Sequence, residues 1–237
     1  MDAARIAYNL ARLLESINKT IERLGVKEAI KLVVVSKQAS LDELQAAYDA
    51  GARDFGESRV ASLVDRAGVF DSKNQEANWH FIGRLQTNKI NQVIKARPAL
   101  LHSLHSFDLA LALQRRLEKQ NLKLDSLLQL NPPNEDSKQG LAPSLAIETY
   151  ERIQYECPHI NLRGIMCIGA HIPSGVPGRE RLIANGFSEA RVVFEKLQSK
   201  GARILSMGMS SDYEIALAEG SNCLRIGSQI FSFYCQN

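Results

Sequence analysis

The regular alternation of short apolar runs with helix-like segments limits the fold of this chain more than any other feature. Strand-like runs occur at 32–36, 52–56, 80–83, 100–103, 126–130, 162–168, 203–207 and 223–226. Within one domain, such alternation requires parallel strands joined by right-handed crossovers. The length of 237 residues is close to the roughly 250 typical of a (β/α)8 barrel. We therefore predict an α/β fold with a single (β/α)8 TIM barrel, with a doubly wound open sheet as the alternative.

An extra helix is expected before the first strand, over residues 3–24. Its apolar residues recur at helical spacing, and Gly25 follows as a C-terminal cap. Other helix starts are marked by local signals: Ser40, Ser106 as an N-cap, Pro143 in a first turn, and Ser211 with Glu214 as a capping box before a helix over 212–219.

Composition indicates an ordinary globular protein, with 45% hydrophobic residues, 23% charged residues and a net charge of +3. Basic residues are scattered among acids, which excludes a nucleic-acid interface, and no apolar run reaches membrane-spanning length. We expect a cytoplasmic protein. His102 and His105 lie on an extended segment and would face opposite ways, which disfavours a metal site. The cysteines lack C-x-x-C spacing and are expected to be buried free thiols: Cys157, Cys167, Cys223 and Cys235.

Lys37 follows the first apolar run, at the carboxyl end of a predicted buried strand. This end of the strands is where α/β folds place their chemistry. A lysine there is expected to be partly desolvated, which favours the neutral amine that forms Schiff bases with aldehydes. A snorkelling lysine with no chemical role is the alternative.

The last two strands end in segments rich in glycine and serine, at 206–210 and 225–228. Loops at these positions of a barrel often bind phosphate, although either segment alone is typical of an ordinary turn. Strands one, seven and eight are neighbours in a closed barrel, so an aldehyde at Lys37 and a phosphate at Ser210, Gly227 and Ser228 could belong to one ligand. Arg225 shares a face with Gly227 and carries a permanent charge, its alternative role being a barrel-end ion pair.

At these positions the chain resembles the YggS/PROSC-type pyridoxal phosphate homeostasis proteins. The matching stretches are 32–37, 51–60, 79–89, 205–210 and 225–228. The resemblance implies a barrel like the N-terminal domain of alanine racemase, with pyridoxal 5′-phosphate (PLP) bound covalently to Lys37 and Arg225 facing the pyridine nitrogen. The cofactor-binding set that it implies is Lys37, Ser58, Met207, Gly208, Ser210, Arg225, Gly227 and Ser228.

Two positions depart from the pattern of the family. The usual Gly-Glu-Asn-Arg-Val is Gly-Glu-Ser-Arg-Val here, so Ser58 is shorter than the asparagine and a contact made by that amide is in question. The last motif often ends in threonine, and Ser228 keeps its hydroxyl.

The resemblance favours a PLP-binding protein of vitamin B6 homeostasis, without evident catalysis. An arginine at the pyridine nitrogen weakens the cofactor as an electron sink. The second base of alanine racemase comes from a C-terminal domain, whereas this sequence ends soon after its last strand. The alternative is a small PLP-dependent amino-acid racemase that uses Lys37 with Tyr213 or His171. A Schiff-base aldolase without PLP is disfavoured by the loops after strands seven and eight.

The remaining expectations concern organisation and partners. Residues 1–237 are expected to form one PLP-binding domain, and the absence of an evident exposed apolar stripe favours a monomer. PLP-dependent apoenzymes are candidate recipients of the cofactor. Lys138, in a loop expected above the ligand face, is a speculative acceptor of the aldehyde during transfer.

Overall fold

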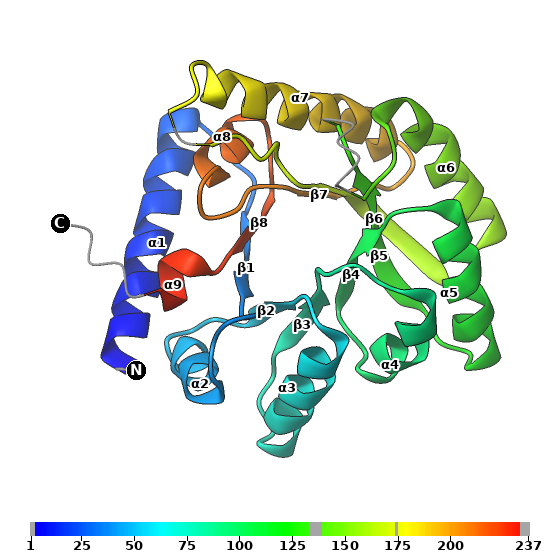
Figure 1. Cartoon of the computed structure of the whole chain (residues 1–237), viewed down its shortest axis with the longest axis horizontal. Coiled ribbons are helices and arrows are strands. Elements are labelled where there is room, and N and C mark those ends of the chain that lie inside the picture. The colour runs from blue at the N-terminus through cyan, green and yellow to red at the C-terminus, as the bar shows by residue number, and fades with distance from the viewer. Residues whose placement is uncertain (1–2, 133–138, 174, 233–237) are drawn as a thin grey trace.

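The eight strands of the protein form a closed parallel barrel. The computed structural model describes residues 3–132, 139–173 and 175–232, and its strands pair in chain order, with β8 returning to β1 (Figure 1). The predicted barrel is confirmed, and the open-sheet alternative is wrong. The strands are β1 (Lys31–Val35), β2 (Asp54–Glu57), β3 (Asn78–Phe81), β4 (Leu100–Leu104), β5 (Leu124–Leu130), β6 (Ile160–Cys167), β7 (Ile204–Ser206) and β8 (Cys223–Ile226).

Helices surround the barrel, and their apolar residues contribute to the main core (Figure 1). The short α9 after the last strand was not predicted. The helices are α1 (Ala3–Leu24), α2 (Leu41–Asp49), α3 (Val60–Ser72), η1 (Thr87–Lys89), α4 (Ile90–Lys95), α5 (Phe107–Lys119), α6 (Pro143–Glu156), α7 (Arg179–Gln198), α8 (Tyr213–Ala218) and α9 (Ser228–Phe231).

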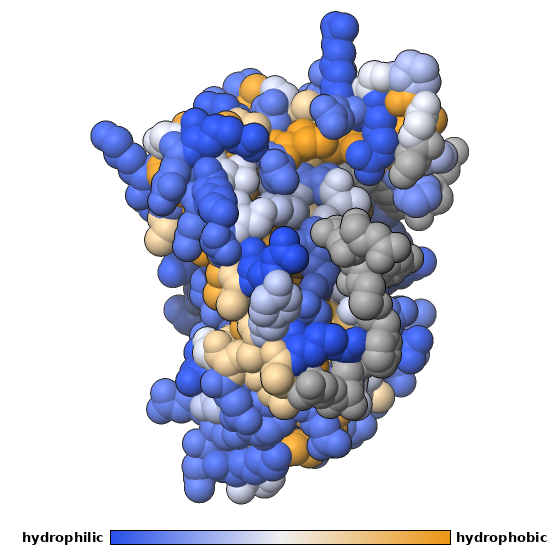
Figure 2. Space-filling model, turned by 90° about the vertical axis from the view of Figure 1, so that its left-hand side faces the viewer, coloured by the Kyte–Doolittle hydropathy of each residue, from blue (hydrophilic) through white to orange (hydrophobic). Residues whose placement is uncertain are grey.

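The predicted helix before the first strand, α1, is confirmed. Its buried residues include Ile6 and Leu10, and it packs against α2, α8 and α9. Asn9 donates a hydrogen bond from Nδ2 to the carbonyl of Ile230, at 3.1 Å, which ties α1 to α9. Figure 2 views the molecule from this side, where most of the visible surface is hydrophilic.

Helix starts were predicted correctly where the cap is purely local. Ser40 and Glu43 form a capping box, and the Ser106 hydroxyl accepts from the amide of Leu109 at 3.2 Å. The capping box predicted at Ser211 is wrong, because the Glu214 carboxylate instead accepts from Arg23 of α1 at 3.0 Å. A partner on a distant helix has replaced the local one.

The interior of the barrel is divided between apolar and polar side chains. Leu100, Leu127 and Met166 form a small apolar cluster that is separate from the main core between the strands and the helices. Cys157, Cys167 and Cys223 are buried free thiols, as predicted, whereas Cys235 lies outside the described residues. No helix in the described part of the chain is long and apolar enough to cross a membrane.

Candidate functional site

Lys37 lies in a tight turn beyond the carboxyl end of β1. The strand ends at Val35, and the amide of Ala39 donates to the carbonyl of Ser36 at 2.8 Å. Ser36 is fully buried, but Lys37 is exposed. The expectation of a partly desolvated amine is therefore wrong. Lys37 lies in the turn that follows β1, outside the sheet, where it is exposed to solvent. An exposed amine can meet a ligand that arrives from solvent.

The turn that carries Lys37 is held by a buried ion pair between Glu57 and Arg66. Arg66 of α3 donates to the carbonyls of Ser36 and Ala39, each at 2.6 Å, and also to the Glu57 carboxylate. Glu57 accepts a further hydrogen bond from the Ser36 hydroxyl, and it has no exposed surface. Charge-assisted hydrogen bonds of this kind are stronger than neutral ones. The backbone of the turn is therefore fixed while the Lys37 side chain stays accessible.

Sequence reasoning missed both members of this ion pair. Glu57 lies inside one of the motifs shared with the resembling family, which was a signal, but no role followed from its spacing. Arg66 lies in the middle of a helix and carried no signal. Their pairing depends on how α3 returns to the barrel.

The end of β8 lies directly against the end of β1 at Gly227. A Cβ on Gly227 would be 2.4 Å from the carbonyl oxygen of Val35, so a side chain cannot fit there. Gly208, after β7, has a φ of +95°, and a Cβ there would lie 2.7 Å from that of Ala216. Close approach thus requires glycine at both positions, and the positive φ is a second reason for it at Gly208. Their bare backbone forms a cradle beside the Lys37 turn.

Two of the predicted phosphate ligands, Ser210 and Ser228, line one surface groove. The groove has a volume of about 1290 Å³ and runs between α1, α8 and α9. Ser210 is half-buried, Ser228 is exposed as the first residue of α9, and the Gln229 amide donates to the Ser210 carbonyl at 2.6 Å. The structure therefore brings both hydroxyls to one wall, beside the start of α9.

Two further predicted site residues, Met207 and Ser58, stand apart from this wall. Met207 is fully buried in the main core, with its sulfur 4.0 Å from the Cys167 thiol, so its side chain serves packing. Ser58 is half-buried in the loop after β2. A Cβ on Gly83 would lie 2.0 Å from the Ser58 carbonyl oxygen, so this glycine allows the loops after β2 and β3 to touch.

Arg225 lies inside the barrel, beneath the cradle. Only 4% of its surface is exposed. It donates from Nη1 to the hydroxyl of Ser206 at 2.6 Å and from Nη2 to the carbonyl of Cys167 at 2.9 Å. Burial lowers its pKa from the ordinary value, although an arginine remains charged at neutral pH. The partners are neutral oxygens, so the alternative role in an ion pair is not borne out by the described contacts.

A polar chain continues from Ser206 across the barrel. The Ser206 hydroxyl is 3.0 Å from Nδ1 of His102, whose Nε2 is 2.9 Å from Nδ1 of His80. Nε2 of His80 is 2.9 Å from a carboxylate oxygen of Asp54, which also accepts from Lys31 at 2.9 Å. Sequence reasoning missed this network.

The electrostatics of the polar chain follow from its burial. Burial, together with the nearby positive charge of Arg225, holds the pKa of His102 well below its usual range. Burial raises the pKa of Asp54, but the hydrogen bonds from His80 and Lys31 outweigh it and leave that pKa below its ordinary value. The chain thus favours a neutral imidazole in its centre and a carboxylate at its outer end.

The two residues considered as a second base do not enter the barrel. The Tyr213 hydroxyl is 3.0 Å from that of Ser16, which places it against α1, and 7% of Tyr213 is exposed. His171 is exposed in the loop after β6. Lys138 lies outside the described residues. No group of three or more histidines, cysteines and acids among residues 3–132, 139–173 and 175–232 could hold a metal ion.

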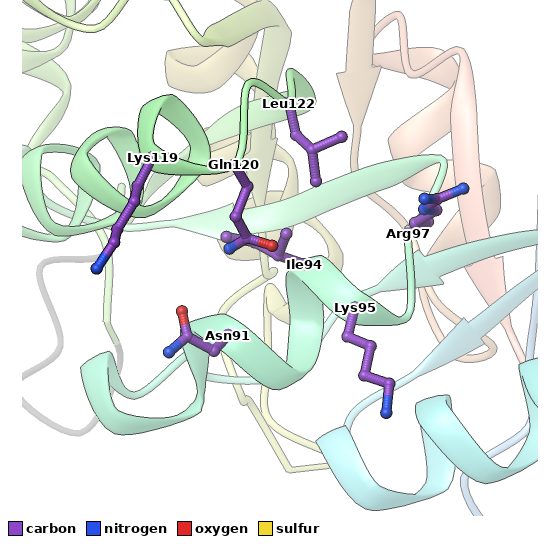
Figure 3. Close-up of a pocket in the computed structure, with 7 residues that line it drawn as sticks. All are labelled: Asn91, Ile94, Lys95, Arg97, Lys119, Gln120 and Leu122. Atoms are coloured by element: carbon purple, nitrogen blue, oxygen red, sulfur yellow. The ribbon is translucent and has the colours of Figure 1, made fainter.

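A second hollow, of about 580 Å³, lies at the opposite end of the barrel (Figure 3). It is lined by basic side chains that precede β4 and β5, namely Lys95, Arg97 and Lys119. None of the predicted site residues lines it. The chemistry predicted from the sequence is therefore confined to the end that carries Lys37.

Known proteins resemble this chain in both sequence and fold. The family model of the alanine racemase N-terminal domain matches residues 2–234. A pyridoxal phosphate homeostasis protein of Helicobacter pylori is 41% identical over 219 residues, which cover 92% of this chain and 95% of that protein. A crystal structure of an unknown protein from Bifidobacterium adolescentis is 33% identical, with a TM-score of 0.87 over 98% of this chain and 97% of that chain. PipY of Synechococcus elongatus, solved with PLP bound, is 29% identical, with a TM-score of 0.76 over 95% and 99%.

Proposed function

Since this chain belongs to the YggS/PROSC family of pyridoxal phosphate homeostasis proteins, we propose that it binds PLP through Lys37 and maintains its level without catalysis. One observation carries the proposal. The contact of Gly227 with Val35 joins the end of β1 to the loop after β8, and the Gln229 side chain ties that segment to Ser210 in the loop after β7. An amine and an anion seat therefore border the same end of the barrel.

The residues at this end fit the chemical groups of PLP. The cofactor would supply an aldehyde, and Lys37 Nζ would form a C=N bond to its carbon with loss of one water. Ser210, Ser228 and the backbone N–H groups at the start of α9 would bind the phosphate, because hydroxyls and free amides are donors to anions. Gly227 allows the loop after β8 to lie against the end of β1, beside Lys37.

Arg225 would face the pyridine ring from inside the barrel and hold it in a weakly activated state. A permanent cation disfavours a proton on the ring nitrogen, which PLP enzymes with strong electron demand require. The Tyr213 hydroxyl is directed to Ser16 of α1 rather than into the barrel. These features favour storage of the aldehyde over turnover of an amino acid.

Borohydride trapping tests the attachment. Purified protein mixed with PLP is reduced, digested and mapped by peptide mass. We expect a pyridoxyl tag on the peptide that contains Lys37, no such tag in Lys37→Ala, and full tagging in Lys95→Ala, whose lysine lies at the opposite end. A tag on another lysine, or none in the native protein, would contradict the proposal.

Deuterium exchange at Cα separates storage from racemisation. The PLP-loaded protein is incubated in deuterated water with single amino acids, and exchange is followed by NMR. We expect no exchange above that of free PLP. Sustained exchange that Lys37→Ala abolishes would instead favour the small racemase.

We extend the proposal to the whole chain as one monomeric PLP-binding unit that releases its cofactor to PLP-dependent apoenzymes. Reactivation of an apoenzyme by the loaded protein, faster than by dilute free PLP, tests delivery, and light scattering tests the monomer. Lys138→Ala tests the suggested acceptor role of that lysine. Unchanged release in this variant would remove Lys138 from the transfer step.

A further inference from the structure

The polar chain inside the barrel links the proposed cofactor site to the opposite end of the strands. Its central members are almost completely buried, with 2% of His80, no surface of His102 or Ser206 and 4% of Arg225 exposed. Lys31 and Asp54 begin their strands and reach solvent, whereas Ser206 ends β7. In the order in which they contact one another, the members of the polar chain are Arg225, Ser206, His102, His80, Asp54 and Lys31.

Arg225 and Asp54, toward the two ends of the polar chain, fix the direction of its hydrogen bonds. Arg225 can only donate, so the Ser206 oxygen accepts from it, and the carboxylate of Asp54 can only accept. If Ser206 donates its own proton to Nδ1 of His102, then His102 carries its proton on Nε2 and donates to Nδ1 of His80. His80 then carries its proton on Nε2 and donates to Asp54. Every contact is satisfied with both imidazoles neutral.

The reverse direction requires one additional proton. With the proton of His102 on Nδ1, its Nε2 must accept from Nδ1 of His80. Nε2 of His80 would then face Asp54 without a proton, unless His80 became an imidazolium. That cation would be buried near Arg225, with Lys31 of β1 also nearby and Asp54 as its counter-charge. Burial opposes a second charge in the barrel.

We propose that His80 and His102 are positioning residues for Arg225, acting through the hydroxyl of Ser206. A serine hydroxyl can rotate, and Arg225 depends on it for one of its two side-chain hydrogen bonds. Donation to His102 locks the hydroxyl with a lone pair facing Arg225 and so fixes the guanidinium under the cradle. The proposal rests on the proposed function for the ligand. The hydrogen-bonded series from Arg225 through Ser206 and His102 to His80, called the relay below, is a property of the protein alone.

NMR of the cofactor-free native protein tests the relay without any variant. Ring nitrogens of ¹⁵N-histidine protein are observed at neutral pH, and single substitutions assign the signals. We expect His80 and His102 both to be neutral with the proton on Nε2. A proton on Nδ1 of His102, or an imidazolium at His80, would overturn the proposal.

Variants of the PLP-loaded protein test the consequence for Arg225. We expect His102→Phe and Ser206→Ala each to shift the absorbance band of bound PLP and to weaken binding about tenfold, the effect of one lost hydrogen bond to a charged group. Because both act through one hydroxyl, the double variant should add little. His159→Phe is the matched control, since that ring contacts the carbonyl of Leu122 outside the relay.

The results separate the relay from the proposed function. An unchanged band and affinity in folded Ser206→Ala would overturn the positioning role. If the native protein took up no PLP, the proposed function would fail, while the NMR tautomers would still decide the relay.

Discussion

The two cations of the candidate site, Lys37 and Arg225, are held in opposite ways. The backbone on either side of Lys37 is fixed by Arg66, which binds the carbonyls of Ser36 and Ala39, while the lysine side chain is exposed. Arg225 is instead fixed by its side chain, in the interior of the barrel. The side chain that we propose binds and releases a ligand is thus free at its tip, and the side chain proposed to hold its charge in place is restrained at its tip.

The largest expected effect comes from breaking the restraint on the Lys37 turn. Arg66→Met would leave the carboxylate of Glu57 buried without its cation, which typically costs about 3–5 kcal/mol. Urea denaturation of the cofactor-free protein measures the loss. Lys19→Met, which breaks the exposed pair with Glu15, should cost far less, because solvent screens an exposed ion pair. Equal losses in the two variants would show that the buried pair does not restrain the turn.

The contact between the two regions gives the next largest effect. Gly227→Ala places a Cβ against the Val35 carbonyl, and overpacking of this kind costs about 1–3 kcal/mol. Gly68→Ala in α3 is the matched control, because a Cβ there meets open space and an alanine should stabilise the helix by about 0.5–1 kcal/mol. The two free energies of unfolding should therefore change with opposite signs. If both free energies of unfolding changed with the same sign, the loop after β8 would be able to shift and accommodate the added methyl group.

The pH dependence of stability tests the interior around Arg225. Because the pKa of His102 is lowered in the folded protein, the unfolded chain binds more protons once the pH falls below the ordinary histidine value near 6.5. Stability is then lost as the pH falls, by up to about 1.4 kcal/mol per pH unit. Asp54, whose folded pKa is also lowered, adds a loss in its own, more acidic range. His102→Gln should flatten the slope between about pH 6.5 and 5, and an unaltered slope would contradict the assignment.

The smallest effect on stability is expected at Lys37 itself. Its side chain is exposed, so Lys37→Ala should change the free energy of unfolding of the cofactor-free protein by less than about 0.5 kcal/mol. The same variant should lose covalent attachment of PLP completely. A loss of stability above about 1 kcal/mol would give Lys37 a structural role and weaken the contrast with Arg225.

Local patterns in the sequence predicted most of the fold. Apolar runs located all eight strands, and their alternation with helices indicated the parallel barrel, because both signals are carried by neighbouring residues. The cap at Ser106 was correct for the same reason, whereas the cap at Ser211 was wrong because Arg23 of α1 binds Glu214. α9 was missed because four residues are too few to show a helical period.

The candidate site was predicted only in part. Lys37 and the glycine and serine loops could be placed at one end of the barrel because they lie at the ends of strands. The network around Arg225 was not, because His80 and His102 are 22 residues apart and His102 and Ser206 are 104 apart. Such pairs meet only through the register of the closed barrel, which no local pattern records.

The pairing of β1 with β8 makes the proposed site dependent on completed synthesis. Lys37 leaves the ribosome long before Arg225, Gly227 and Ser228 have been translated, so a nascent chain carries the amine without the cradle. Contacts between residues so far apart in sequence form late and slowly in folding. Capture of the aldehyde in its proposed seat can therefore begin only once the last strand has closed the barrel, which would reserve the cofactor for finished molecules.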